Sequence, residues 1–195
     1  MKKTLAFLLS FLTFFLFVTN ATTVKVGSGG DYPSLKDAFF DINKGFLTGD
    51  IVIEITSNLT ETAAVKLTAS GVINPGGTSN YNTVTIYPTT TSIVVSGNLP
   101  TANLIDLYGA DSVTIDGRVN REGSTVSLTI ENTGNTGASA VGLSFHAEFN
   151  KIQFCNLKGF STTARGIINL DNRSGASGNG DVGGDARDGL CSTSS

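Results

Sequence analysis

Residues 105–115 read IDLYGADSVTI, and residues 143–154 read LSFHAEFNKIQF. Each stretch holds two short runs in which apolar and polar side chains alternate, separated by a turn of small or polar residues. The runs at 105–107 and 112–115 correspond to those at 143–145 and 151–154, at offsets of 38 and 39 residues. A recurring unit of this length, built from short strands, is typical of a solenoid.

Runs of the same kind fill most of the chain between residues 51 and 170. Each has four or five residues with an apolar-x-apolar centre, and clusters of Gly, Asn, Asp, Ser or Thr separate them, which predicts short strands joined by turns. The expected strands are 51–55, 64–67, 83–87, 92–95, 104–107, 112–115, 127–130, 142–145, 151–154 and 166–170. A β-sandwich would show the same strands, and their spacing alone does not separate the two architectures. The repeat favours an all-β fold, a right-handed parallel β-helix.

One helix is expected before these strands, over about residues 32–43. Four apolar residues fall on one of its faces at helical spacing: Leu35, Ala38, Phe39 and Ile42. Asp31 or Ser34 can cap its start, and Gly45 can end it. An open β-helix end exposes core and unpaired strand edges. The apolar face of this helix is therefore expected to form a structural cap over the N-terminal end.

The two chain ends differ in composition from the middle. Residues 1–21 begin with Lys2 and Lys3, continue with an apolar run of about 15 residues and end at Ala21, which predicts a cleaved secretory signal peptide. The run is shorter than the roughly 20 residues of a spanning helix, so no stable membrane span is expected after cleavage. Residues 22–173 are expected to form the β-helix segment, and the Gly/Ser/Asp-rich residues 174–195 a disordered tail. The expected location is secreted or cell-surface.

Composition excludes several classes of function. The chain has 13 Lys and Arg against 16 Asp and Glu, and no clustered basic run, so a nucleic-acid partner is not expected. Two Cys cannot build a disulfide-rich scaffold. One disulfide between Cys155 and Cys191 is open, and the alternative is that Cys155 is a small buried apolar residue. Asp181, Asp185 and Asp188 fit neither common calcium-loop spacing. No cofactor or metal is expected.

The stretch GSGGDYPSLKDAF at residues 27–39 resembles the N-terminal region of pectin-lyase-like β-helix proteins, pectin methylesterases among them. Further similarity follows at NKG (43–45), TGDI (48–51), YP (87–88) and GADSVTIDGR (109–118). Together, in this order, they resemble the N-terminal region of large secreted Bacteroidota β-helix surface proteins, which are often exported by the type IX pathway. The resemblance covers about residues 24–172. It implies further coils and a C-terminal sorting domain, so we expect an N-terminal fragment, truncated at the C-terminus.

The catalytic motifs of the resembled enzymes do not occur in this sequence. The carboxylate and arginine motifs of pectin methylesterases and polygalacturonases are absent, and TIDGR at 114–118 is similar to a stretch that is structural in polygalacturonases. Asp106, Asp116 and Asp171 are expected to end strands and close turns through bonds to backbone. Arg118 and Arg121 are then expected to be solvated loop residues, and His146 a turn or surface residue.

Two functions remain open at this stage. The first is a structural or adhesin-like module with no catalytic residues of its own, possible partners being polysaccharides or cell-surface glycans. Tyr81, Tyr87 and Tyr108 can stack on sugar rings, or alternatively pack as strand formers on half-buried faces. The second is the N-terminal part of a carbohydrate-active enzyme, of polysaccharide lyase, pectinesterase or glycoside hydrolase type, whose active site lies downstream.

Overall fold

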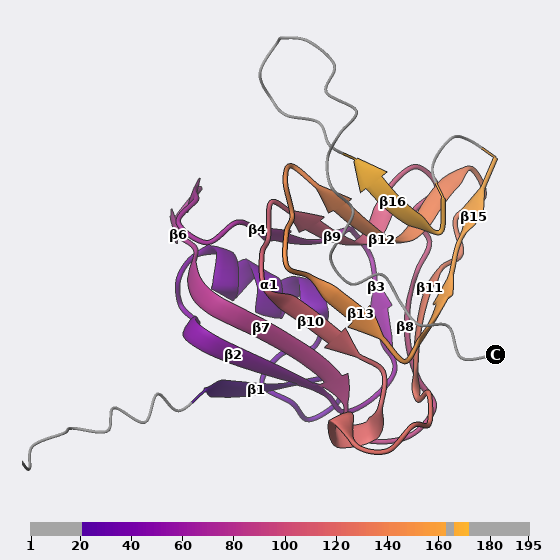
Figure 1. Ribbon diagram of the computed structural model, residues 1–195, viewed down its shortest axis with the longest axis horizontal. Coiled ribbons are helices and arrows are strands. Elements are labelled where there is room, and N and C mark those ends of the chain that lie inside the picture. Colours follow the sequence, from indigo (N-terminus) through magenta and orange to yellow (C-terminus); the bar gives the residue numbers. More distant parts are fainter. Residues whose placement is uncertain (1–20, 163–165, 172–195) are drawn as a thin grey trace, which may run out of the picture.

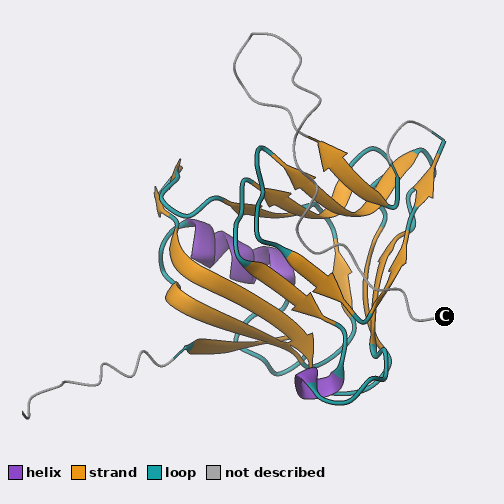
Figure 2. Ribbon diagram, viewed as in Figure 1, coloured by secondary structure: helices purple, strands orange, loops and turns teal. Residues whose placement is uncertain are grey.

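The computed structural model describes residues 21–162 and 166–171, and within them short strands wind around a common core (Figures 1 and 2). The predicted signal peptide up to residue 20, the tail 174–195 and Cys191 lie outside these residues. The elements in chain order are β1 (Thr22–Val26), α1 (Leu35–Asn43), β2 (Thr48–Ile55), β3 (Leu59–Glu61), β4 (Val65–Thr68), β5 (Ile73–Asn74), β6 (Gly77–Thr78), β7 (Asn80–Pro88), β8 (Ile93–Gly97), β9 (Asn103–Tyr108), β10 (Val113–Asp116), the 3-10 helix η1 (Val119–Arg121), β11 (Leu128–Asn132), β12 (Gly137–Ser144), β13 (Lys151–Gln153), β14 (Cys155–Lys158), β15 (Phe160–Ser161) and β16 (Ile168–Asp171).

Three sheets run along the solenoid. Sheet A has the order β1-β2-β7-β10-β13, sheet B the order β3-β8-β11-β14, and sheet C the order β4-β9-β12-β16, all with parallel neighbours. Each coil contributes one strand to each sheet, so β2, β3 and β4 form the first of about four coils. The prediction of a parallel β-helix is confirmed, and the sandwich alternative is wrong.

The core consists of rows of aliphatic side chains that continue from coil to coil. In sheet A, Val24, Ile53, Ile86, Ile115 and Ile152 pair in register and are all buried. Equivalent rows run through sheet B from Leu59 to Leu157 and through sheet C from Val65 to Ile168. Parallel strands place like positions side by side, so burial of these rows is the main source of stability.

The internal repeat predicted from the sequence is real, but its alignment was wrong by two residues. Leu107 pairs with Leu143 rather than with Phe145. Likewise Thr114, and not Ser112, pairs with Lys151. A shift of two residues keeps every side chain on the same face of a strand, so alternation of apolar and polar residues cannot detect it.

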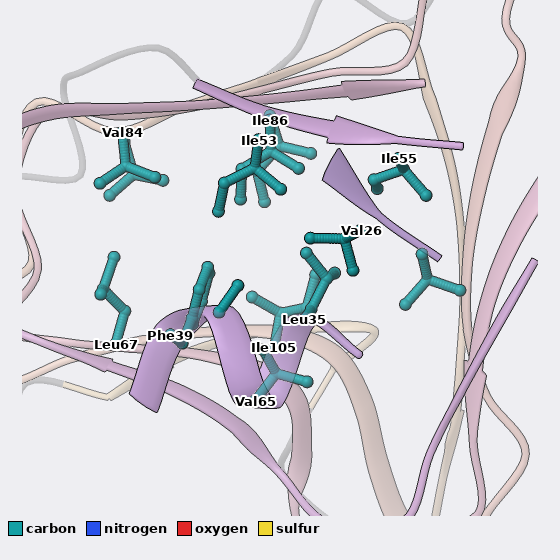
Figure 3. Packing of buried hydrophobic residues seen from close by; sticks show 14 of the residues in the cluster. Val26, Leu35, Phe39, Ile53, Ile55, Val65, Leu67, Val84, Ile86 and Ile105 are labelled. Atoms are coloured by element: carbon teal, nitrogen blue, oxygen red, sulfur yellow. The ribbon is translucent and has the colours of Figure 1, made fainter. Parts of the chain in front are cut away.

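Helix α1 closes the N-terminal end as predicted, with Leu35, Ala38, Phe39 and Ile42 fully buried. Figure 3 shows Leu35 and Phe39 among the side chains of sheets A and C. The helix begins at Leu35 rather than at Tyr32, because Ser34 is the N-cap and accepts a hydrogen bond from the Asp37 N–H. Tyr32 instead forms an isolated parallel bridge with Val26.

A buried carboxylate joins this helix to the first coil. Oε1 of Glu61, on β3, accepts a hydrogen bond of 2.8 Å from the Leu35 N–H at the start of α1, where the helix dipole favours negative charge. Burial raises the pKa of Glu61, although the N–H groups of Leu35 and Lys36 act in the opposite direction. Glu61 therefore helps to position helix α1, in addition to the buried apolar face of that helix.

Asparagine side chains connect adjacent coils at the corners between sheets. Oδ1 of the Asn58 side chain accepts a hydrogen bond from the Val94 N–H of the next coil. The Asn150 side chain contacts the preceding coil, because its Nδ2 donates to Ala110 O and its Oδ1 accepts from the Val113 N–H. These bonds satisfy backbone groups that no strand pairs at a corner.

The described residues include no helix with the length and apolar character to cross a bilayer.

Candidate functional site

The structure does not bring the three predicted tyrosines together. The Tyr81 ring is buried in the core, and its hydroxyl donates to Thr68 O at 2.8 Å. Tyr87 is also buried and donates to the Glu54 carboxylate at 2.9 Å. Burial raises the pKa of both phenols. Neither ring presents an open face on which a sugar could stack.

Tyr108 lies at the surface of sheet C, between two neighbours. The Lys66 ammonium is 3.3 Å from the centre of the Tyr108 ring. The centres of the Tyr108 and Phe145 rings are 3.9 Å apart. Lys66 comes from the first coil, Tyr108 from the second and Phe145 follows the third, so these side chains connect successive coils. The cation–π and aromatic contacts give Tyr108 a role in packing on this face.

Asp116 forms the most extensive charged cluster among the described residues, on the outer face of sheet A. Its carboxylate accepts from Arg118 Nε at 2.9 Å and Nη2 at 2.6 Å, and from Gln153 Nε2 at 2.7 Å. Burial raises the pKa of Asp116, but the hydrogen bonds from Arg118 and Gln153 outweigh burial and hold it below its usual value.

The predicted turn role of Asp116 is confirmed, because its Oδ1 also accepts from the Arg118 N–H two residues on. Arg118 lies in the loop after β10, as predicted, but its side chain is only partly exposed and is not simply solvated. Its guanidinium binds Asp116 with two nitrogens and lies 4.4 Å from the Phe154 ring centre. Arg121 is exposed as predicted, and so is His146, which lies in a turn with φ of 61°.

A shallow depression of about 370 Å³ opens at the corner between sheets B and C. We call it the Phe160 depression, and its lining residues are Glu131, Asn132, Thr133, Gly134, Asn135, Lys158, Gly159 and Phe160. They come from the end of β11, the β11–β12 loop, the end of β14 and β15, so two neighbouring coils form it. Binding sites for small ligands commonly occupy concave surfaces of roughly 300–1,000 Å³.

The floor of the Phe160 depression is held rigidly by Asn132. Its Nδ2 donates to Leu99 O at 3.1 Å, Ala102 O at 2.9 Å and Ser139 O at 3.1 Å. Its Oδ1 accepts from the N–H groups of Leu99 and Gly134. With these bonds made, Asn132 shapes the loop and contributes little to a ligand directly. A floor fixed in advance lowers the entropic cost of binding.

The walls of the depression carry the groups that a ligand can reach. Glu131 and Lys158 are paired positions of β11 and β14 on the outer face of sheet B. The Phe160 side chain is 51% exposed, and Asn135 is exposed in the loop opposite. A carboxylate acceptor, an ammonium donor, an amide and an aromatic face thus border one depression, which is suited to a ligand with hydroxyl groups and an apolar face.

Sequence reasoning missed the Phe160 depression and named tyrosines instead. The available signal was Phe160 itself, a large apolar residue between Gly159 and Ser161 outside any alternating run. The described residues contain no group of three or more His, Cys, Asp and Glu side chains that could hold a metal ion. No protein-family model matches the chain, and no curated protein or solved structure matches it significantly.

Proposed function

We propose that this chain is a secreted or cell-surface β-helix module of structural or adhesin-like type that contacts glycans through the Phe160 depression. The observation that carries the proposal is the exposed Phe160 ring beside Glu131, Lys158 and Asn135 in a concave surface. The apolar face of a pyranose ring can pack on Phe160, while its hydroxyl groups exchange hydrogen bonds with the polar walls.

Two further observations support this proposal. The N-terminal residues have the pattern of an export signal, which supports a location outside the cell, where polysaccharides are found. The depression is open, and the hydrogen bonds of Asn132 hold its loop in place, so it can accept one or two sugar units of a longer chain without closing around them. Such contacts are individually weak, and repeated contacts along one polysaccharide raise the overall affinity.

The test is a glycan array followed by titration of the best ligand. We expect Phe160→Ala to weaken binding at least about tenfold, equivalent to about 1.4 kcal/mol. Phe149→Ala is the matched control, because Phe149 is similarly exposed but lies in the loop between β12 and β13. Equal binding by the wild type and Phe160→Ala, or no binding to any glycan, would refute the proposal.

The enzyme alternative is examined in the same experiment. Each bound polysaccharide is incubated with the protein and assayed for new reducing ends, unsaturated ends and released methanol. An adhesin-like module leaves the polysaccharide unchanged. A product that forms with the wild type and disappears in Phe160→Ala would replace our proposal by a catalytic one at the same depression.

A further inference from the structure

The outer face of sheet B carries a row of polar side chains that continues from the Phe160 depression along the solenoid axis. Glu131 and Lys158 lie in the wall of the depression, and the paired positions of the two preceding coils are Ser96 on β8 and Thr60 on β3. We call these four residues the sheet B row. Their strands, of which Figure 1 shows β3, β8 and β11 side by side, pair without the register shift found between β2 and β7. The row is therefore straight, and neighbouring positions are about 4.8 Å apart.

The side chains of the sheet B row are accessible to a ligand. Thr60 and Lys158 are exposed, and Ser96 and Glu131 are half-buried. Within the described residues, Glu131 and Lys158 form no ion pair although they are neighbours, and the Thr60 hydroxyl makes no hydrogen bond. The Ser96 hydroxyl donates to Leu59 O at 3.2 Å, which leaves its lone pairs to accept from a ligand. Donors and acceptors that the protein itself does not use thus follow one line from coil to coil.

The outer faces of the other two sheets differ, because many of their polar side chains bind one another. On sheet A, Tyr87 donates to Glu54 and Gln153 donates to Asp116. On sheet C, the Lys66 ammonium lies over an aromatic ring of the next coil. A hydroxyl or charged group that already has a partner gains little by exchanging it for a ligand. These contacts make sheets A and C poorer surfaces for a glycan than the sheet B row.

The geometry and charge of the row select the kind of glycan. One strand spacing is close to the length of one pyranose unit, so a straight row over successive coils suits a chain that is itself extended. Equatorial β-1,4 linkages give a straight ribbon, whereas α-1,4 linkages curve the chain into a helix. The row holds one carboxylate, from Glu131, and one ammonium group, from Lys158. A uronate or sulfate group is therefore repelled by one as it is attracted by the other, which favours a neutral sugar.

We propose that the glycan bound at the Phe160 depression is an extended, neutral, β-1,4-linked chain that lies along the sheet B row, with about one sugar unit on each coil. This inference rests on the proposed function, because the depression supplies the first contact. Units beyond the depression then reach Ser96 and Thr60 in turn. One hydrogen bond exchanged with water in this way raises the affinity by about two- to tenfold. The sheet B row therefore acts as a measure of chain length.

The experiment measures affinity against chain length by isothermal titration calorimetry of the full chain. The probes are cello-oligosaccharides and β-1,4-manno-oligosaccharides of two to six units, with malto-oligosaccharides of the same lengths as the control for linkage. A double variant, Thr60→Ala with Ser96→Ala, removes two hydroxyl groups of the row and leaves the depression intact. Thr85→Ala is the matched control, because Thr85 is half-buried on the outer face of sheet A as Ser96 is on that of sheet B. Circular dichroism first checks that the variants keep the wild-type spectrum.

We expect the affinity of the β-1,4-linked oligosaccharides to increase up to about four units and then to level off, and malto-oligosaccharides to gain nothing beyond two units. The double variant should bind the tetrasaccharide about tenfold more weakly than the wild type and Thr85→Ala do, and bind the disaccharide equally well. An affinity independent of length, an equal gain for malto-oligosaccharides, or wild-type affinity of the double variant for the tetrasaccharide would overturn the proposal.

Failure of the proposed function itself gives a different result. If no glycan binds, or if Phe160→Ala binds the disaccharide as the wild type does, the Phe160 depression is not the glycan site and the sheet B row falls with it. If Phe160→Ala weakens binding of the disaccharide but length has no effect, the depression remains a glycan site and the sheet B row alone is wrong. Binding of other glycans on the array, without binding of any β-1,4-linked oligosaccharide, has the same meaning.

Discussion

Replacing Phe39 by alanine tests the capping role of α1 directly. The Phe39 side chain is fully buried between sheets A and C (Figure 3). Removal of a buried Phe ring costs about 3–5 kcal/mol, because apolar contacts are lost and a cavity remains. This is a large share of the roughly 5–15 kcal/mol that stabilises a typical domain. At about 2–4 °C per kcal/mol, the melting temperature should fall by about 6–20 °C.

The adjacent residue provides a matched control. Phe40 lies on the same helix but is 53% exposed, with the Lys44 ammonium 4.0 Å from its ring centre. Phe40→Ala should therefore lose only about 0.5–1 kcal/mol, from that cation–π contact. Urea titration and thermal melting followed by circular dichroism measure both variants at low protein concentration. Equal losses of stability in the two variants, or a loss below about 1 kcal/mol for Phe39→Ala, would refute the capping argument.

Two further predictions concern buried carboxylates. The raised pKa of Glu61 means that its contribution to stability is full below the ordinary pKa of 4.5 and is lost as the pH rises through the folded-state value. In urea titrations from pH 4 to 7, the free energy of unfolding of Glu61→Gln should therefore increase relative to that of the wild type as the pH rises. A difference in unfolding free energy that stays constant over this range would contradict the prediction. The lowered pKa of Asp116 has the opposite effect on stability. Its contribution is full above the ordinary pKa of 3.8 and is lost as the pH falls through the folded-state value. Asp116→Ala should lower the melting temperature more at pH 7 than at pH 2.5, and an equal loss at both would show that the charge is unimportant.

Much of the fold could be predicted because one rule repeats in every coil. Alternation of apolar and polar residues located each of the ten expected strands within a few residues of its observed bounds. It missed β1 and the two-residue strands β5, β6 and β15. It also missed β3, where the inward position at its end is Glu61 instead of an aliphatic residue. It also extended the strand at 151–154 through Phe154 and missed β14 directly after it, because Phe154 adopts a left-handed conformation with φ of 51° that apolar residues seldom favour.

The functional surface was harder to predict, because it depends on local irregularity. The register of β2 and β7 shifts between Gly49 and Asp50, so Asn82 is an extra residue on β7. This bulge separates Tyr81 from the alternation that continues to Tyr87, and Tyr81 turns into the core. Phe160 is brought beside β11 only by the stacking of the third and fourth coils, which no local pattern in the sequence specifies.

A solenoid of this kind divides stability and surface recognition among different residues. The aliphatic rows stay in register although the coils between equivalent isoleucines vary from 29 to 37 residues, so the corners absorb every difference in length. Changes at a corner, such as the loop around Asn135, can therefore alter the shape of the Phe160 depression with little effect on the core. The rows have no such freedom, because each side chain contacts its equivalents in the coils on either side.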